Sequence, residues 1–236
     1  MDETSRLRYS RLIAVEGIGR EGVDRLRRAR VLVAGCGALG SMAAMQLAGS
    51  GVGHLRIADF DTIDISNLQR QFFYRTSETG MGKAETLKER IEALNPEVRV
   101  EVIPEMLTRR NCNDIMDGCD FVVEATDNHA SMLLIDEVCE AKGIPCVMAG
   151  ISGFSGQVVG CMPGGRRYRD LFPAADDGDD GVLPCSMAGV VGPGAALAAS
   201  IEAAEAIKHI AGMGMSLADR MLVFDLAAMR FDIFET

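Results

Sequence analysis

A glycine-rich segment constrains this chain more than any other feature. Gly35-Cys36-Gly37-Ala38-Leu39-Gly40 follows the apolar run 31–33, and a helical pattern and a second apolar run then lead to Asp59. A glycine loop that closes a strand and opens a helix, with a carboxylate roughly 20 residues on, is typical of nucleotide-binding α/β proteins. The loop amides can bind phosphate, and Asp59 can accept hydrogen bonds from ribose hydroxyls. A dehydrogenase and a mononucleotide enzyme both fit this pattern.

Strand and helix patterns alternate around this loop. Strands are predicted at 31–33, 54–59, 98–102, 121–123 and 145–150, and helices at 41–50, 83–94, 111–117 and 131–142. This order predicts a parallel, doubly wound, Rossmann-like sheet that binds ligands at the carboxyl ends of its strands. Further strands are predicted at 154–161, 221–225 and 229–233. We therefore expect an α/β fold whose mainly parallel sheet is extended by antiparallel C-terminal strands.

The chain shows no internal repeat and no linker, so we expect one domain over residues 1–236. Residues 1–29, of mixed charge, predict an N-terminal helical arm, and residues 30–151 predict the nucleotide-binding part. Residues 152–236 form a second part, with an irregular crossover segment at about 162–189. A loop of this length inside a compact domain is usually functional or disordered.

Composition excludes several classes of protein. The net charge of −10 argues against a nucleic-acid-binding surface. No apolar run approaches the ~18 residues of a membrane-spanning helix, and the polar N-terminus is unlike a signal peptide. The seven cysteines include no CxxC pair, so neither a disulfide framework nor a zinc site is suggested. We therefore expect a cytoplasmic protein without nucleic-acid or membrane partners.

Charged residues after the second predicted strand favour ATP as the nucleotide. Arg70 offers a bidentate guanidinium and Lys83 a point charge at a predicted helix start, and both suit a polyphosphate. Asp127 ends a predicted strand beside the same crevice and could hold Mg²⁺ that bridges phosphates. Asn67 and Gln71 add neutral donors. Each alone could be a solvated side chain, but together they form a clamp for which a nicotinamide site has little use.

Short motifs occur in a fixed order along nearly the whole chain. They are Arg8-Tyr9-Ser10-Arg11, Gly35-x-Gly37-x-x-Gly40, Asp59-Phe60-Asp61, Ser66-Asn67-Leu68-Gln69-Arg70-Gln71, Gly82-Lys83, Ala125-Thr126-Asp127-Asn128, Gly153-Phe154-x-Gly156-Gln157 and Cys185-x-x-Ala188-Gly189-Val190-x-Gly192-Pro193. In order and spacing this series resembles the ThiF/MoeB/HesA family, the bacterial relatives of ubiquitin-activating enzymes. Such a series is far more specific than a lone glycine loop.

The resemblance implies an adenylyltransferase. Such enzymes use MgATP to adenylate the C-terminal glycine carboxylate of a ubiquitin-like sulfur-carrier protein and release pyrophosphate, in thiamine, molybdopterin or related sulfur-transfer biosynthesis. It implies that residues 152–236 bind a carrier ending in Gly-Gly, that Arg11 reaches across a homodimer to the neighbouring active site, and that a sulfur donor protein would be a further partner. The ATP-binding residues that it implies are Gly35, Gly37, Ala38, Gly40, Asp59, Asp61, Asn67, Arg70, Gln71, Lys83, Asp127 and Asn128, with Mg²⁺ on Asp127.

The catalytic residues that the resemblance implies are Arg11, Arg70, Lys83, Asp127 and Cys185. Cys185 matches the position of a cysteine able to link covalently to the activated carrier in ThiF-like members, and an ordinary loop thiol is an equally good interpretation. Relatives commonly carry a zinc tetrad, but Arg167 and Asp170 stand where its first cysteine pair would be. We therefore expect no structural zinc.

Three other functions fit part of the sequence. Adenylation of a peptide or of a tRNA base would keep the chemistry and change the substrate, although the net charge of −10 argues against tRNA. An NAD-dependent dehydrogenase is favoured only by the glycine loop and Asp59. A non-catalytic scaffold could dimerise through the predicted apolar helix 195–211, but the complete set of polyphosphate-binding residues speaks against it. The sequence names neither the carrier nor its pathway, and it leaves open whether sulfur transfer occurs on this protein.

Overall fold

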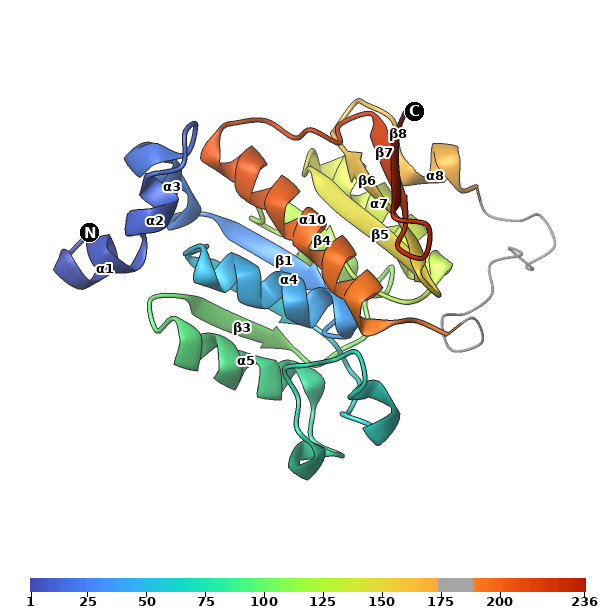
Figure 1. Ribbon diagram of the computed structural model, residues 1–236, viewed down its shortest axis with the longest axis horizontal. Coiled ribbons are helices and arrows are strands. Elements are labelled where there is room, and N and C mark those ends of the chain that lie inside the picture. The colour runs from blue at the N-terminus through green and yellow to red at the C-terminus, as the bar shows by residue number, and fades with distance from the viewer. Residues whose placement is uncertain (174–188) are drawn as a thin grey trace.

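The computed structural model describes residues 1–173 and 189–236, whose strands form one eight-stranded sheet (Figure 1). In chain order the strands are β1 (Arg30–Ala34), β2 (His54–Ala58), β3 (Arg99–Ile103), β4 (Phe121–Glu124), β5 (Cys146–Ser152), β6 (Ser155–Cys161), β7 (Arg220–Asp225) and β8 (Arg230–Glu235). Across the sheet they run β3-β2-β1-β4-β5-β6-β7-β8. The strands from β3 to β5 in this order pair in parallel, and those from β5 to β8 pair antiparallel. The predicted fold class is confirmed.

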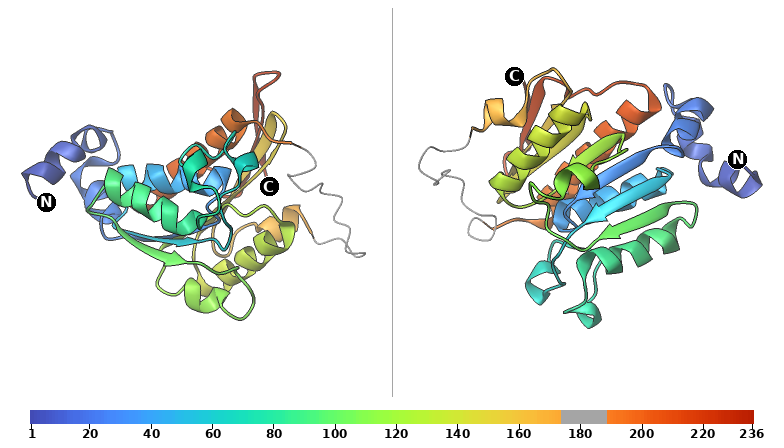
Figure 2. Two further views of the ribbon diagram at one scale, coloured as in Figure 1. Left: turned by 90° about the horizontal axis from the view of Figure 1, so that it is seen from below. Right: turned by 180° about the vertical axis from the view of Figure 1, so that it is seen from behind.

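Helices cover both faces of this sheet (Figure 2). They are α3 (Gly19–Leu26), α4 (Ala38–Gly49), α5 (Lys83–Leu94), α6 (Cys112–Ile115), α7 (His129–Lys142), α8 (Tyr168–Leu171) and α10 (Gly192–Ala211), with 3₁₀ turns η1 (Ile65–Asn67) and η2 (Thr76–Glu78) between β2 and α5. Helices α4, α5 and α10 pack on one face, and α6 and α7 on the other. In the part of the chain that the structure describes, no helix is both long and apolar enough to span a membrane.

Alternating side chains of the central strands fill two apolar cores. Val31 and Val33 of β1 lie in the core under α4, α5 and α10, whereas Leu32 and Ala34 lie in the core under α6 and α7. Successive side chains leave a strand on opposite faces, so a strand covered on both faces needs a continuous apolar run. Burying one Val or Leu side chain contributes roughly 1.5–3 kcal/mol. This burial fixes β1 in the middle of the sheet and therefore fixes the glycine loop that follows it.

Two helix boundaries show how local sequence places the site. Helix α5 spans the predicted range 83–94, because the extended Gly82 precedes it and Asn95-Pro96 cannot continue it. Helix α4 starts at Ala38, earlier than the predicted 41–50, because the extended Gly37 is its N-cap. The glycine loop therefore leads directly into the first turn of α4.

The N-terminal arm consists of short helices, as predicted: α1 (Glu3–Arg8), α2 (Ser10–Ile13) and α3. Buried Tyr9 fixes the arm, since its hydroxyl accepts a hydrogen bond from Nδ2 of Asn95 at 2.9 Å. The arm lies where the parallel strands begin, at the end of the sheet opposite the glycine loop (Figure 1). Arg11 is exposed on α2 and is therefore remote from the glycine loop of its own chain.

One buried carboxylate anchors the segment after β6. Asp136 of α7 accepts hydrogen bonds from Nη2 of Arg167 at 3.1 Å and from the backbone N of Tyr168 at 3.3 Å, and Asp170 accepts from the backbone N of Arg167 at 3.0 Å. Arg167 thus holds α8 on α7, and Asp170 caps the start of α8. Among residues 1–173 and 189–236, no cluster of His, Cys, Asp and Glu is arranged to hold a metal ion. Cys185 lies outside the described residues.

Candidate functional site

The glycine loop at the carboxyl end of β1 is closed by backbone contacts. Gly35 has a φ of +97°, and a Cβ there would collide with the carbonyl oxygen of Ala125 after β4. A Cβ at Gly40 would collide with the carbonyl oxygen of Gly35, so both positions require glycine. At Gly37 an added Cβ would meet only Nε2 of Gln71, at 3.7 Å. The loop is therefore packed on one side and open on the side of Gly37.

The open side presents the amino end of α4. The first turn of a helix has N–H groups without intrahelical partners, which attract anions. Ala38 is the first residue of α4 and contributes its backbone amide whatever its side chain is. Tyr74 supports the loop, because its hydroxyl donates to the carbonyl oxygen of Cys36 at 2.7 Å. Burial raises the pKa of the Cys36 thiol well above its ordinary value, which fits a packing residue rather than a nucleophile.

Asp59 follows β2 and faces the glycine loop. Its Oδ2 accepts a hydrogen bond from the backbone N of Cys36 at 2.6 Å, and its Oδ1 accepts one from the backbone N of Asp61 at 2.8 Å. Burial raises the pKa of the Asp59 carboxyl above its ordinary value, although both hydrogen bonds and the charge of Lys83 oppose the shift. Each carboxylate oxygen can accept more than one hydrogen bond, so Asp59 can still accept from a ribose hydroxyl.

Lys83 and Asp61 form an ion pair beside Asp59. The Nζ of Lys83 lies 2.8 Å from Oδ2 of Asp61, and the Lys83 side chain is only 7% exposed. The backbone N of Lys83 also donates to the carbonyl oxygen of Asp61 at 3.0 Å. Lys83, the predicted phosphate-binding cation, therefore already forms an ion pair with Asp61. Because an ammonium group has three donors, Lys83 can keep this partner and bind a phosphate oxygen.

Three further predicted residues come from the polar loop around η1. Arg70 donates from Nη1 to a backbone carbonyl four residues earlier, at 3.1 Å. Asn67 accepts from the backbone N of Asp64 at 3.3 Å as part of the cap of η1. Gln71 is buried, and its Oε1 has no hydrogen-bond partner in the described part of the chain. A buried amide oxygen of this kind normally has a donor, so Gln71 fits a ligand that supplies one.

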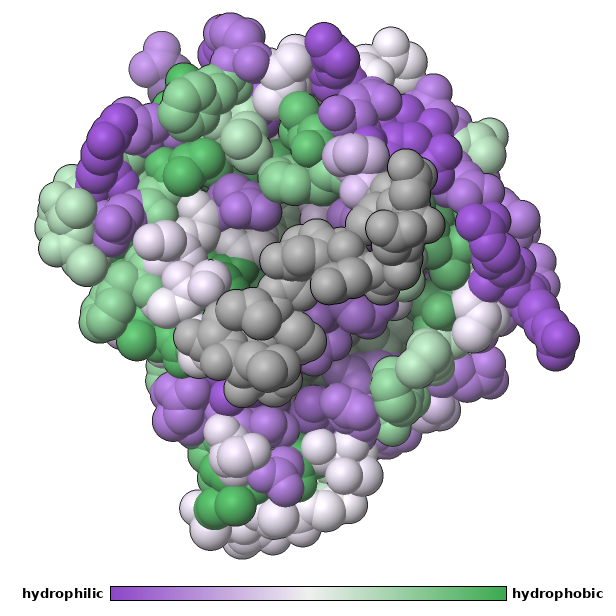
Figure 3. Space-filling model, turned by 90° about the vertical axis from the view of Figure 1, so that its right-hand side faces the viewer, coloured by the Kyte–Doolittle hydropathy of each residue, from purple (hydrophilic) through white to green (hydrophobic). Residues whose placement is uncertain are grey.

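The turn after β4 brings two more predicted residues to the carboxyl ends of the parallel strands. The backbone N of Ala125 donates to the carbonyl oxygen of Ala34 at 2.8 Å, which joins this turn to the end of β1. Asp127 is exposed, and Asn128 is the N-cap of α7, its Oδ1 accepting from the backbone N of Ser131 at 2.8 Å. Figure 3 views this side of the molecule, where hydrophilic and apolar side chains are interspersed.

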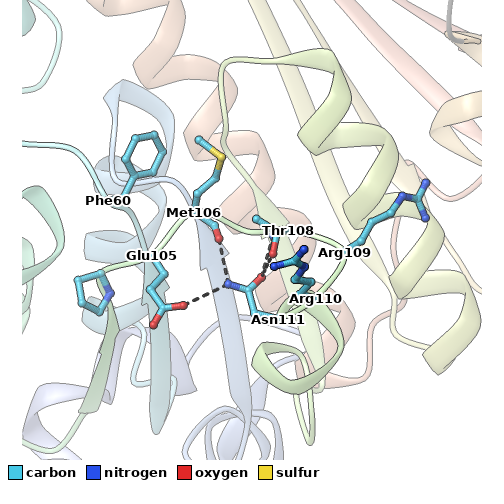
Figure 4. Close-up of a pocket in the computed structure, with 8 residues that line it drawn as sticks. Phe60, Glu105, Met106, Thr108, Arg109, Arg110 and Asn111 are labelled. Carbon is cyan, nitrogen blue, oxygen red and sulfur yellow. Dashed lines mark hydrogen bonds between the residues drawn. The ribbon is translucent and has the colours of Figure 1, made fainter.

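A cavity of about 810 Å³ opens beside Asp59, at the carboxyl ends of β2 and β3 (Figure 4). It is lined by Phe60, Pro104, Glu105, Met106, Thr108, Arg109, Arg110 and Asn111. The large apolar side chains are Phe60 and Met106, which are 56% and 51% exposed and lie close together in Figure 4. The backbone N of Asp59 donates to the carbonyl oxygen of Ile103 at 3.1 Å and so joins the two strand ends. The apolar surfaces of Phe60 and Met106 suit the flat face of a nucleotide base, and the other lining residues are mostly polar.

Glu124, the last residue of β4, is a buried carboxyl that the motifs do not single out. One of its oxygens accepts from the backbone N of Thr126 at 2.8 Å and from the Thr126 hydroxyl, and the other has no partner among the described residues. Burial raises the pKa of Glu124 to about 8, against the effect of the Thr126 hydrogen bonds. These contacts fix the turn that carries Asp127. The signal in the sequence is a charged residue that ends an otherwise apolar strand.

The geometry thus gathers the predicted nucleotide-binding residues at one edge of the sheet, with Arg11 at the other end and Cys185 outside the described residues. The sequence model of the ThiF family matches residues 9–236 of this chain. The chain belongs to the ThiF family. The match includes the glycine loop, Asp59, Lys83, Asp127 and the cavity residues. The family predicted from the motifs is therefore confirmed.

Individual relatives agree with this assignment. This ThiF-family chain is 38% identical over 233 residues to the SAMP-activating enzyme E1 of Haloferax volcanii. The alignment covers 98% of this chain and 86% of the relative. It is also 38% identical over 233 residues to the sulfur carrier protein adenylyltransferase of Thermus thermophilus. That alignment covers 95% of this chain and 84% of the relative. Among solved structures, that of PaaA has a TM-score of 0.84 at 26% identity and covers 100% of this chain and 74% of its own.

Proposed function

We propose that this chain uses ATP to adenylate the C-terminal glycine carboxylate of a ubiquitin-like sulfur-carrier protein and releases pyrophosphate. The observation that carries the proposal is that the glycine loop contacts Asp59, that Lys83 pairs with the nearby Asp61, and that a cavity with room for a base opens beside them. Membership of the ThiF family and the similarity to a sulfur carrier protein adenylyltransferase support the substrate class. The biosynthetic pathway served is sulfur transfer to thiamine, molybdopterin or a related product.

The reaction requires charge stabilisation more than proton transfer. The carrier carboxylate attacks the α-phosphorus of ATP, the bond from this phosphorus to the bridging oxygen breaks, and an acyl adenylate and pyrophosphate form. Negative charge on the phosphoryl oxygens is stabilised by donors fixed in place beforehand. The amides at the start of α4, the ammonium group of Lys83 and the guanidinium of Arg70 are these donors. Asp59 orients the ribose.

Asp127 would hold Mg²⁺ bound to the ATP phosphates. Mg²⁺ usually keeps several water ligands and takes only one or two protein carboxylates when it binds phosphates, so a single exposed carboxylate fits. The metal would neutralise part of the phosphate charge. Asn128 uses its oxygen to cap α7, which leaves its amide N–H₂ to donate to ATP.

The carrier would dock on residues 152–236. Strand β8 at the edge of the sheet carries Phe231 and Ile233, which are 48% and 60% exposed. Their cross-strand neighbours on β7 are Phe224 and Leu222, which pack in the core on the face of the sheet that α10 covers. Phe231 and Ile233 therefore lie on the same face of the sheet, but α10 does not cover them. Exposed apolar patches of this kind are typical of protein–protein interfaces. A small folded carrier could cover this patch while its flexible tail extends to the crevice.

A second copy of the chain would supply Arg11. Within one chain Arg11 lies at the amino ends of the strands, so it can contribute to adenylation only in a homodimer. Arg11→Ala should then lower the rate of adenylation without changing the unfolding temperature. Full activity of this variant would contradict the role.

ATP–pyrophosphate exchange tests the central proposal. Exchange should depend on an added ubiquitin-like carrier that ends in Gly-Gly and should stop when the two glycines are deleted. Absence of exchange with every carrier, together with absence of ATP binding, would refute it. The covalent role of Cys185 stays a prediction, and a carrier adduct that forms with the wild type but not with Cys185→Ser would support it.

A further inference from the structure

The side chain of Asn111 makes four hydrogen bonds within the loop that borders the cavity (Figure 4). Its Oδ1 accepts from the backbone N of Thr108 at 2.7 Å and from the Thr108 hydroxyl at 2.9 Å. Its Nδ2 donates to the carbonyl oxygen of Met106 at 3.0 Å and to Oε2 of Glu105 at 3.3 Å. One amide thus connects three residues of the cavity wall.

These bonds matter because the loop between β3 and α6 has no regular secondary structure. Buried Leu107 anchors the loop in the core beside α6 and α7. The neighbouring Met106 is exposed to the cavity, and its backbone is fixed by Asn111. The position of the Met106 side chain next to Phe60 therefore depends on the Asn111 amide.

We propose that Asn111 is a positioning residue that gives this protein its preference for purine nucleotides. By holding Met106 beside Phe60, it forms an apolar wall on which the flat face of a base packs. A purine covers more of this wall than a pyrimidine does, and apolar contact scales with the area buried. Asn111 acts on the base through the loop, because its hydrogen bonds hold the backbone of Met106. This inference rests on the proposed use of ATP.

The proposal separates recognition of the base from recognition of the phosphates. The phosphates would contact the start of α4, Lys83 and Arg70, none of which hydrogen-bonds to Asn111. Asn111→Ala should therefore weaken ATP binding about tenfold, because ATP would have to order the loop that these hydrogen bonds otherwise fix beforehand. CTP binding should change less than about twofold by the same argument. The turnover number at saturating ATP should stay unchanged.

Calorimetric titration of the whole protein with ATP and with CTP tests this, alongside KM and kcat from carrier-dependent exchange. Asn113→Ala is the matched control, because Asn113 is an exposed amide two residues away. Arg70→Ala serves as the phosphate benchmark and should weaken ATP and CTP equally. Met106→Ala removes the apolar side chain but keeps the backbone carbonyl that Asn111 binds. It should therefore reduce the preference for ATP over CTP, and it replaces Asn111→Ala as the test if that variant folds poorly.

The outcomes are distinct. A smaller ATP-to-CTP affinity ratio in Asn111→Ala and Met106→Ala, with an unchanged ratio in Asn113→Ala, supports the proposal. An unchanged ratio in Met106→Ala overturns it, as does a fall in kcat at saturating ATP without a change in the ratio. A wild-type protein that binds neither nucleotide would refute the proposed function itself, and this result is recognisable before any variant is made.

Discussion

The parallel and antiparallel halves of the sheet expose different parts of their strands. Strands β1 and β4 are covered on both faces, and the predicted nucleotide-binding residues lie in the loops and helix starts that follow the parallel strands. Strand β8 shows the reverse arrangement. Phe231 and Ile233 are exposed on one of its faces and Phe234 on the other, because no helix of residues 1–173 or 189–236 covers this edge strand.

The difference indicates two ways in which one sheet can serve two substrates. A strand end held by buried neighbours fixes a side chain within tenths of an ångström, which suits recognition of phosphates and ribose. A strand face offers a broad apolar surface, which suits a folded protein. Variants in the two halves should therefore affect ATP and carrier independently.

The largest effect is expected at the nucleotide end. Asp127→Ala should lower ATP–pyrophosphate exchange by about 10²–10³-fold, the size seen when one charge-stabilising group is lost. The fold should persist because Asp127 is exposed. Asp114→Ala, which removes another exposed carboxylate, is the control and should leave exchange intact. Full exchange by Asp127→Ala would remove the Mg²⁺ assignment.

A smaller effect is expected on the face of β8. Ile233→Ser should weaken carrier binding about tenfold, because it removes an exposed apolar side chain from the proposed interface. The affinity for ATP should not change. Binding of a labelled carrier and calorimetry with ATP measure the two quantities, and Glu235→Ser on the same strand is the control. A parallel loss of ATP affinity in Ile233→Ser would show that the two halves are coupled.

The last effect concerns stability rather than binding or rate, namely its dependence on pH near the nucleotide end. Glu124 has an ordinary pKa of 4.5 and a pKa of about 8 in the fold, so between these values the folded chain keeps a proton that the unfolded chain has lost. Its contribution to stability is complete below pH 4.5 and is lost as the pH rises through 8. The free energy of unfolding should fall by up to about 1.4 kcal/mol per pH unit from this group.

Glu124→Gln should remove the contribution of Glu124 to the fall of the unfolding free energy with pH. Chemical denaturation at several pH values measures this fall. Glu92→Gln, at an exposed position of α5, should retain the wild-type slope. Burial also raises the pKa of Glu202 in α10, so a slope of the same sign should remain in Glu124→Gln. An identical pH profile for wild type and Glu124→Gln would mean that Glu124 is ionised in the fold.

The elements of the fold were predictable where local signals coincide. Helix α5 matches its predicted range because Gly82 and Asn95-Pro96 mark both ends, whereas the start of α4 lies in the glycine loop, where an apolar pattern gives no boundary. The parallel pairing of the first five strands was predictable from the alternation of strands and helices, since parallel strands need crossovers.

The site was predictable where it depends on spacing along the chain, as for the glycine loop and Asp59. Contacts between distant segments were not. The pairing of Lys83 with Asp61 joins residues on two sides of a long loop, and the bonds of Asn111 depend on how an irregular loop folds. The burial of Glu124 was not predictable either, because the sequence of a strand does not reveal whether a charged residue at its end will be buried.

The attachment of α8 to α7 has a consequence for the conditions under which this protein keeps its shape. Asp136 is buried, and it ties down α8 through the Arg167 guanidinium and the backbone of Tyr168. Salt screens this attachment only weakly, because Asp136 is buried and the Arg167 side chain is mostly buried. The segment after β6 should therefore stay docked on α7 in concentrated salt.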